Sequence, residues 1–357
     1  MKLAFLSPCW SGPHYGGVQL TARLALEALS RGGNSVRFLG YGPACERGAH
    51  SDAVSRDSVE LCSRSRRGAA FAALRYRAWP DRLLFWHADL LKLLPFIGAR
   101  GRRKLLFLHG IECWRKMDGA LASGLDQIDV FLSNSDFTWQ RFIAANPRWA
   151  GAKHCTIPLG LGTPELNVER PANIPAAIMI GRMSKGEGYK GHEEVIGAWP
   201  RVLQAIPQAE LWIVGGGDAA AGLRALAAVS EAGERIRFFG VVSDAQKDRL
   251  LRHSRCLVLP SRGEGFGLVY LEAMRLGRPC LASIHDAGRE VVGPPEAGLA
   301  VDPANPEELA QAIARLLTPG AEWERWSAVA RRRYESGFTA VHFQRRLVEA
   351  VKEELAA

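Results

Sequence analysis

Short apolar runs alternate with amphipathic helical segments along most of the sequence. The chain opens with an apolar run at Leu3–Leu6, a glycine-rich turn at 11–17 and a helical pattern over Val18–Leu29. Such strand–turn–helix units build parallel sheets covered by helices. We therefore predict an α/β fold of the doubly wound, Rossmann-like type. Further strands of the first half are expected at 36–39, 105–108 and 130–132.

A second alternation follows a break, which predicts two domains. Proline and glycine interrupt both helix and strand patterns between about 157 and 175. A chain of 357 residues also exceeds what one hydrophobic core usually supports. We expect one domain over 1–164, joined by a helix at about 340–357, and another over 165–339. Strands of the second are expected at 177–180, 211–214, 236–239 and 256–259, and helices at 193–205, 219–232 and 245–253.

Composition and cysteine content exclude several classes of protein. Apolar residues make up 47% and charged residues 23%, which are globular values, and no apolar run approaches the ~20 residues of a membrane-spanning helix. The short apolar start, ended by Pro8, favours a first strand over a signal peptide. Seven scattered cysteines without a CxxC pair predict neither a disulfide framework nor a zinc site. These features predict a cytoplasmic protein.

Positive charge is concentrated in the first half. Residues 1–164 hold 22 Lys and Arg against 12 Asp and Glu (22 − 12 = +10), and the rest holds 24 against 25 (−1). Within 56–104 the balance is 12 against 4, or +8, and six aromatic residues are interleaved. Three interpretations are open: peripheral contact with the anionic inner face of a cell membrane, solvated surface over core aromatics, or nucleic-acid binding. We favour membrane contact over the other two. The aromatic residues are Phe71, Tyr76, Trp79, Phe85, Trp86 and Phe96.

The stretch Pro260–Ser283 predicts an anion-binding site. A strand ends there, a glycine-punctuated loop follows, and a helix begins. Backbone N–H groups at such a helix start lack partners within the helix and bind phosphate. Glu264 lies in the loop and Glu272 lies eight residues later, about two turns along. Two carboxylates can therefore point toward one cleft at different depths.

A second loop, Gly181–His192, combines glycines with basic residues after another expected strand. Cations positioned beside a departing diphosphate stabilise its developing negative charge by about 2–4 kcal/mol each when water is excluded. By the family resemblance described next, we assign Arg182 and Lys190 to this role and expect Lys185 to be solvated.

These stretches resemble family 4 glycosyltransferases, whose signature is an E-x7-E element. The resemblance is close over about 177–317 and loose over the N-terminal half. It implies the GT-B fold, with two Rossmann-like domains facing across a cleft and a C-terminal helix crossing back to the first. The first domain would bind the acceptor and the second the nucleotide-sugar donor. A Gly-x-Gly-x-x-Gly motif is missing after the first strand, which disfavours a dinucleotide oxidoreductase.

The resemblance also implies roles for individual residues. Glu264 would contact hydroxyls of the transferred sugar and Glu272 the ribose, with Arg182 and Lys190 at the diphosphate. His109 would lie near the sugar as a further catalytic residue; Glu112 and Glu290 are weaker candidates. The remaining donor-binding residues would be Gly16 and Gly17 at the phosphates, Gly215 and Gly216 near the donor, Val241 and Val242 near the base, and the backbone of Gly265, Phe266, Gly267 and Leu268.

The implied reaction is retaining transfer of a hexose of mannose or glucose type from a GDP- or UDP-linked donor to an acceptor hydroxyl. A lipid-linked saccharide in polysaccharide or glycolipid biosynthesis fits the basic first half. No acidic cluster with metal-ligand spacing is evident, so we expect no metal cofactor. A sugar-nucleotide epimerase and a non-catalytic nucleotide-sugar-binding protein are the alternatives. The intact set Glu264, Glu272, Arg182 and Lys190 disfavours the latter.

Overall fold

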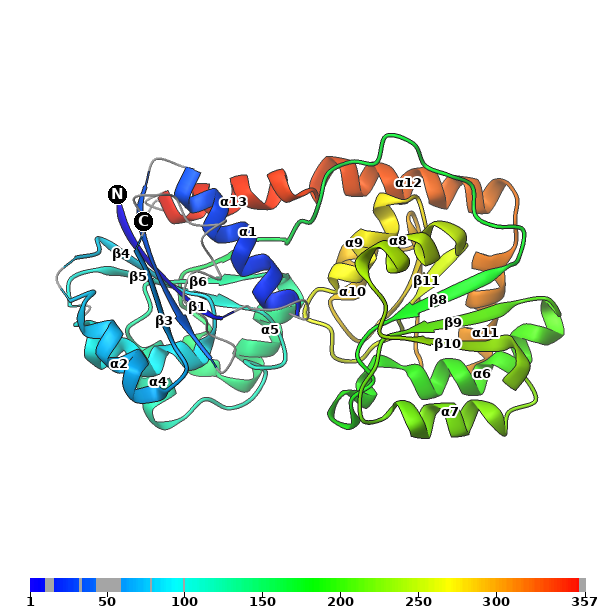
Figure 1. The fold of residues 1–357 in the computed structure, drawn as a ribbon, viewed down its shortest axis with the longest axis horizontal. Coiled ribbons are helices and arrows are strands. Elements are labelled where there is room, and N and C mark those ends of the chain that lie inside the picture. The colour runs from blue at the N-terminus through cyan, green and yellow to red at the C-terminus, as the bar shows by residue number, and fades with distance from the viewer. Residues whose placement is uncertain (10–15, 32–33, 43–58, 78, 99, 353–357) are drawn as a thin grey trace. The chain divides into compact units, whose positions relative to one another are not determined.

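The structure, a computed structural model, describes residues 1–9, 16–31, 34–42, 59–77, 79–98 and 100–352. The chain divides into two compact units (Figure 1). Unit 1 comprises 1–160 and 340–357, and unit 2 comprises 161–339. The division therefore falls after residue 160 rather than after residue 164, and the C-terminal segment belongs to unit 1. Most of the predicted glycine-rich turn, 10–15, lies outside the described residues.

Unit 1 is built on a seven-stranded parallel sheet with the order β3-β2-β1-β4-β5-β6-β7. Because β1 lies in the middle, the chain builds outward to one edge and then to the other. The helix α1 (Gly17–Arg31) packs with the C-terminal helix α13 (Ala340–Lys352). The strands are β1 (Lys2–Pro8), β2 (Ser35–Tyr41), β3 (Val59–Ser63), β4 (Arg82–Phe85), β5 (Arg103–Leu108), β6 (Val130–Ser133) and β7 (His154–Thr156).

The core of unit 1 forms between this sheet and four helices. Alanines of one helix and large apolar residues of the others pack on Leu83, Phe85 and Phe131. Fully buried strands of this kind favour continuous apolar runs. The helices are α2 (Arg66–Leu74), α3 (Leu94–Ile97), α4 (Gly119–Leu125) and α5 (Asp136–Ala145).

Unit 2 is built on a six-stranded parallel sheet with the order β10-β9-β8-β11-β12-β13. The strands are β8 (Ala176–Ile180), β9 (Glu210–Val214), β10 (Ile236–Gly240), β11 (Cys256–Val258), β12 (Cys280–Ser283) and β13 (Gly298–Val301). The chain leaves β8 toward β9 and β10, then returns to place β11 on the other side of β8. The strand order therefore reverses between β8 and β11, and ligands of open α/β sheets bind at the carboxyl ends of strands at such a point.

Helices cover both faces of this sheet (Figure 1). On one face α6 (His192–Ala205) packs closely against α11 (Pro306–Leu317), and Trp199, Val202 and Ile313 are buried there. On the other face α9 (Leu268–Arg275) packs against α12 (Ala321–Gly337), with α8 (Asp244–His253) beside α9. The remaining helices are α7 (Ala220–Ala228) and α10 (Gly288–Val292). The expected helix at 219–232 thus ends earlier, at Ala228.

Two further observations bear on the sequence-based expectations. Cys9, directly after β1, forms a disulfide bond, which the scattered cysteines of the sequence did not indicate. Cys113, Cys256 and Cys280 are free thiols. Among the described residues, no helix combines the length and apolar character needed to cross a membrane.

Candidate functional site

Two loops meet at the point in unit 2 where the strand order reverses. The loop after β8 runs through a 3-10 turn at Lys185–Lys190, and the loop after β11 runs to the start of α9. The backbone N–H of Arg262 donates to the carbonyl oxygen of Tyr189 at 2.8 Å. The ring of Tyr189 lies against Gly263, where any Cβ would come within 2.5 Å of it. The two predicted site loops are therefore held directly together.

Lys190 and Glu264 form an ion pair across these two loops. Lys190 Nζ lies 2.7 Å from Glu264 Oε1, and their side chains are only 13% and 18% exposed. Burial alone would lower the pKa of Lys190, but Glu264 outweighs it and the pKa is raised. The structure thus brings together a fixed cation and a carboxylate that sequence analysis chose independently.

Arg182 occupies the same loop but points elsewhere. Its side chain is 76% exposed, and its guanidinium pairs with Glu187 of the same loop. Lys185 is exposed, as expected of a solvated residue. Of the two chosen cations, Lys190 is therefore in place beside Glu264, whereas Arg182 would need a change of side-chain rotamer to join them.

The start of α9 has the geometry expected of a phosphate-binding helix end. Gly267, with φ of 84°, precedes the helix, and no side chain caps it. A Cβ at Gly267 would come within 2.6 Å of the Tyr270 ring, so this position requires glycine. Gly265 and Phe266 are buried, and the Phe266 ring packs near Phe338 at 6.1 Å. Their contribution to a ligand site is thus made by the backbone.

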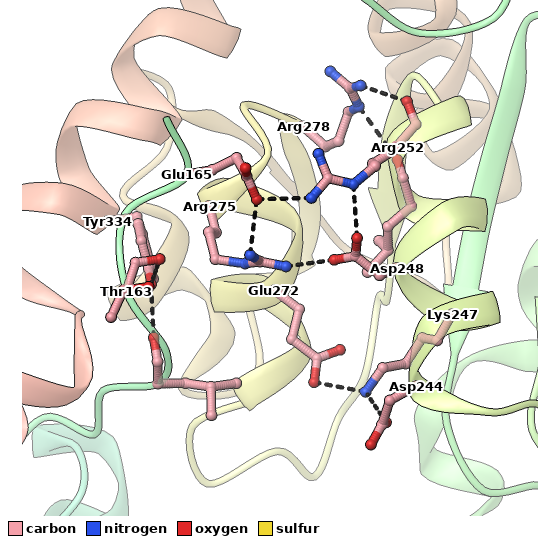
Figure 2. A network of polar contacts seen from close by, with 12 residues as sticks. Thr163, Glu165, Asp244, Lys247, Asp248, Arg252, Glu272, Arg275, Arg278 and Tyr334 are labelled. Atoms are coloured by element: carbon pink, nitrogen blue, oxygen red, sulfur yellow. Dashed lines mark hydrogen bonds and ion pairs between the residues drawn. The ribbon is translucent and has the colours of Figure 1, made fainter. Parts of the chain in front are cut away.

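Glu272 lies further along α9 and has its own cation (Figure 2). Lys247 Nζ on α8 lies 2.9 Å from Glu272 Oε1, and it also contacts the exposed Asp244 at 3.3 Å. Burial would lower the pKa of Lys247, but Glu272 and Asp244 raise it overall. Sequence analysis missed Lys247, because nothing local to α8 shows which residue of α9 it faces.

A closed ring of charges fixes α8 against α9 next to this pair (Figure 2). Glu165 accepts from Arg252 at 2.7 Å and from Arg275 at 3.1 Å, and Asp248 accepts from the same two arginines. Arg278, nearby, donates to backbone carbonyl oxygens including that of Glu169. Because two acids balance two bases, the ring is neutral and its role is structural: it sets the distance between the helices that carry Lys247 and Glu272.

The glycines after β9 have a packing role. A Cβ on Gly215, which has a φ of 133°, would lie 1.9 Å from the carbonyl oxygen of Gly181. A Cβ on Gly216 would lie 2.8 Å from the Val241 side chain. Val241 is 66% exposed and Val242 is half-buried, both after the end of β10. These glycines let the ends of β8, β9 and β10 approach one another, and Val241 presents an apolar surface at that edge.

In unit 1, His109 lies at the carboxyl end of β5 in a largely apolar environment. Its Nε2 lies 2.8 Å from the carbonyl oxygen of Trp86, and it packs against the rings of Trp86 and Phe107. Burial lowers the pKa of His109 to about 3. The imidazole is therefore neutral near pH 7, and the bond to Trp86 makes Nε2 the protonated nitrogen.

Of the other candidates, Glu112, Gly16 and Gly17 lie in unit 1, and Glu290 lies in unit 2. The carboxylate of Glu112 accepts from the backbone N–H of His109 at 2.6 Å, which gives Glu112 a structural role. Gly16 and Gly17 are exposed at the start of α1. Glu290 lies on α10 in unit 2, and its carbonyl oxygen accepts from Arg333 at 2.7 Å. Within the part of the chain that the structure describes, no group of three or more His, Cys, Asp or Glu residues is arranged to hold a metal ion.

Comparisons with known proteins agree with this geometry. Residues 174–319 match the family described as glycosyl transferases group 1. A phosphatidyl-myo-inositol mannosyltransferase of Mycobacterium leprae is 36% identical over 175 residues, covering 47% of this chain and 45% of that protein. A GDP-mannose-dependent monoacylated alpha-(1-6)-phosphatidylinositol monomannoside mannosyltransferase of Corynebacterium glutamicum is 26% identical over 267 residues, 69% of each chain.

Among solved structures, HepE of Anabaena in complex with UDP-glucose superimposes with a TM-score of 0.76. The identity is 17%, and the match covers 98% of this chain and 99% of HepE. At this identity the likeness shows the fold alone, and the chain spans less than half of the first mannosyltransferase. The chain therefore has the GT-B fold, and residues 174–319 of its second unit match the glycosyl transferases group 1 family.

Proposed function

We propose that the protein is a retaining glycosyltransferase that moves a hexosyl group from a nucleotide-diphosphate sugar to an acceptor hydroxyl. The observation that carries the proposal is the Lys190–Glu264 ion pair, 2.7 Å long, at the reversal of strand order in unit 2. It lies where ligands of such sheets bind, next to a helix start suited to phosphate. Lys190 suits the phosphate side of a sugar–phosphate bond, and the carboxylate of Glu264 suits the hydroxyl groups of the sugar.

In the proposed step, the bond between the anomeric carbon and the diphosphate oxygen breaks, and the electron pair leaves with the diphosphate. The acceptor oxygen forms its bond to the anomeric carbon on the same face, and its proton passes to the departing diphosphate oxygen. Lys190, joined by Arg182 after it leaves Glu187, stabilises the charge that develops on the leaving group. Glu264 holds sugar hydroxyls, so this route depends on positioning rather than on a dedicated side-chain base.

The proposed donor is a GDP- or UDP-linked hexose of mannose or glucose type. The names of the relatives support this: the corynebacterial enzyme is described as GDP-mannose-dependent, and HepE binds UDP-glucose. Glu272, held by Lys247, would bind the ribose, and the exposed Val241 would lie against the base. The proposal includes independence from metal ions, since Lys190 and Arg182 provide positive charge at the diphosphate. Addition of EDTA is then expected to leave the transfer rate unchanged.

The proposed acceptor is a lipid-linked saccharide, reached by peripheral contact of unit 1 with the inner face of the cell membrane. The aromatic residues of 56–104 divide: Tyr76, Phe85 and Trp86 are buried, whereas Phe71 is 73% exposed. Phe71 and Leu74 share one face of α2 with the exposed Arg67 and Arg75. This face, which we call the α2 face, combines the apolar and cationic groups that suit an anionic lipid surface.

Incubation of the protein with GDP-mannose, UDP-glucose and a lipid-linked acceptor tests the proposal. We expect a nucleoside diphosphate and a glycosylated product to form in equal amounts, with the anomeric configuration of the donor retained. With donor alone, slow release of the nucleoside diphosphate is expected; interconversion of the donor sugar would instead identify an epimerase. Binding of these donors without any turnover would leave the protein a non-catalytic binder and would refute the proposal.

A matched pair of variants in one loop tests the role of Lys190. Lys190→Gln is expected to reduce turnover by about 10²- to 10³-fold, because it removes a preorganised cation from the leaving group. Lys185→Gln, in the same loop but exposed, is expected to retain normal turnover. Similar rates for the two variants in a steady-state assay would contradict the assignment.

A further inference from the structure

Asp286 is a fully buried carboxyl group beside the Glu264 loop. It follows β12 and precedes α10, and its exposure is 0%. Neither the E-x7-E element nor the basic loop includes it. A buried carboxyl group that forms no ion pair with the described residues needs an explanation, because isolated acids are costly to bury.

Both carboxylate oxygens of Asp286 accept from backbone N–H groups. Oδ2 accepts from Glu264 at 3.2 Å, and Oδ1 accepts from Gly288 at 2.8 Å. The side chain of Ser261, in the same loop as Glu264, also bonds to Asp286. In return, the N–H of Ala287 donates to the carbonyl oxygen of Glu264 at 3.1 Å. The peptide groups on both sides of Glu264 are thus fixed to the segment that Asp286 begins.

From these contacts we infer that Asp286 is a positioning residue of the transfer site, which holds the backbone of Glu264 where its carboxylate can meet Lys190 and the donor sugar. The inference rests on the function proposed above. Glu264 lies in a loop rather than in a helix or strand, so no regular hydrogen-bond ladder fixes it. The bond from its N–H to Asp286 supplies that constraint, and the bond from Gly288 fixes Asp286 in turn.

The chemistry of the contacts requires a carboxylate. An amide of the same shape has one oxygen and one NH2 group, so it would direct a donor at the N–H of either Glu264 or Gly288. Burial, which outweighs these hydrogen bonds, raises the pKa of Asp286 to about 7. The protein therefore retains an acid at a place where burial opposes its ionisation, as expected when the residue is needed for geometry rather than for stability.

Asp286→Asn tests the inference, with His285→Gln as the matched control. His285 is the neighbouring residue, but its side chain is half-exposed and pairs with Asp302 instead of the loop. We expect Asp286→Asn to lower kcat by about tenfold or more, as for a misplaced catalytic group. Its Kd for the nucleoside diphosphate alone should stay within about twofold of wild type, because the part of the donor that Glu264 is proposed to contact is the sugar, which this ligand lacks. His285→Gln should change neither value.

Two further measurements separate positioning from a general structural effect. In a double-mutant cycle with Glu264→Gln, the loss from Asp286→Asn should largely disappear, because both act through one carboxylate. Amide hydrogen exchange of 259–267 should accelerate in Asp286→Asn and remain normal in His285→Gln. Normal kcat in Asp286→Asn, additive losses, or unchanged exchange would each overturn the inference.

Failure of the proposed function would give a different pattern. If the wild-type protein neither binds a nucleoside diphosphate nor transfers sugar, the proposed function falls, and the catalytic part of this inference falls with it. The exchange measurement still decides whether Asp286 fixes the Glu264 backbone, since it needs no substrate.

Discussion

At the scale of single residues, the candidate site places charged groups at different degrees of burial. Lys190 and Lys247 each pair with one glutamate. Burial alone would lower the pKa of each lysine, but the paired carboxylates raise that pKa overall. Each acid of the E-x7-E element therefore has a lysine of its own. Asp286, a buried acid outside this element, differs because backbone N–H groups hold it rather than a cation.

The pKa of Asp286 predicts a specific contribution to the pH dependence of stability. Its pKa is about 7 in the folded chain, against an ordinary value of 3.8. The folded state therefore holds a proton that the unfolded state loses, so this contribution is complete below about pH 4 and is lost as the pH rises through 7. Relative to Asp286→Asn, wild type should lose stability between pH 4.5 and 7.5. Urea unfolding of both proteins at the two pH values measures the difference in their free energies of unfolding. A difference that stays constant between the two pH values would refute the prediction.

Histidines with lowered pKa values contribute in the opposite direction in both proteins, which is why the comparison between them is needed. Burial lowers the pKa of His109 to about 3, and those of His154 and His192 to about 4. Their contribution to stability is present above pH 6.5 and is lost as the pH falls through those values. The difference between wild type and Asp286→Asn cancels this common part.

At the scale of helices and strands, the pair α8 and α9 positions Glu272, the proposed ribose-binding group. The charge ring around Glu165 fixes their separation, and Lys247 then meets Glu272 (Figure 2). We expect Lys247→Met to raise the KM for the donor by about tenfold, or about 1.4 kcal/mol, with kcat little changed, because the ribose does not react. Asp244→Asn alters the other partner of Lys247, which is 99% exposed, and should have no effect. A fall in kcat at constant KM would contradict this role.

The α2 face makes its own prediction. Replacement of Phe71 and Leu74 by serine should weaken binding to anionic vesicles, because it removes the apolar groups that would enter the interface. Val229→Ser is the control, since Val229 is 84% exposed but lies in unit 2. Flotation with phosphatidylglycerol vesicles at low salt measures the effect. No binding by the wild-type protein would exclude the proposed membrane contact.

The elements also show which parts of the fold the sequence could predict. The runs that form β8, β9 and the Leu105–Leu108 part of β5 are largely apolar, because these strands lie inside their sheets, and all three were expected. The strands β3, β7 and β13 were missed, and all three form sheet edges. The strand His154–Thr156 is only three residues long, so its pattern is too brief to indicate a strand. The interior strands β4 and β12, of four residues each, were missed as well.

For the site, local motifs were sufficient for residues that lie in loops after strands. Lys190 and Glu264 were chosen from separate motifs, and the fold brings them within 2.7 Å. Lys247 and Asp286 were missed, because their significance comes only from partners on other elements. The exposed position of Arg182, paired with Glu187, also depends on side-chain packing that spacing along the sequence does not report.

At the scale of the whole chain, the two units carry different chemistry. The net positive charge lies in the first half, together with the α2 face, whereas the paired acids and lysines lie in unit 2. This division supports the proposed assignment of acceptor binding to unit 1 and donor binding to unit 2. The central claim is that the loops after β8 and β11 form a binding site for a nucleotide-linked sugar.

Isothermal titration of the protein with UDP, GDP and their hexose conjugates tests that claim most directly. We predict saturable binding of one nucleoside diphosphate, strongly weakened in Lys190→Gln and unchanged in Lys185→Gln. A ligand at 100 times its Kd should also add about 2.7 kcal/mol to the free energy of unfolding. The absence of binding by either nucleotide series, or equal affinity in the two lysine variants, would contradict the account.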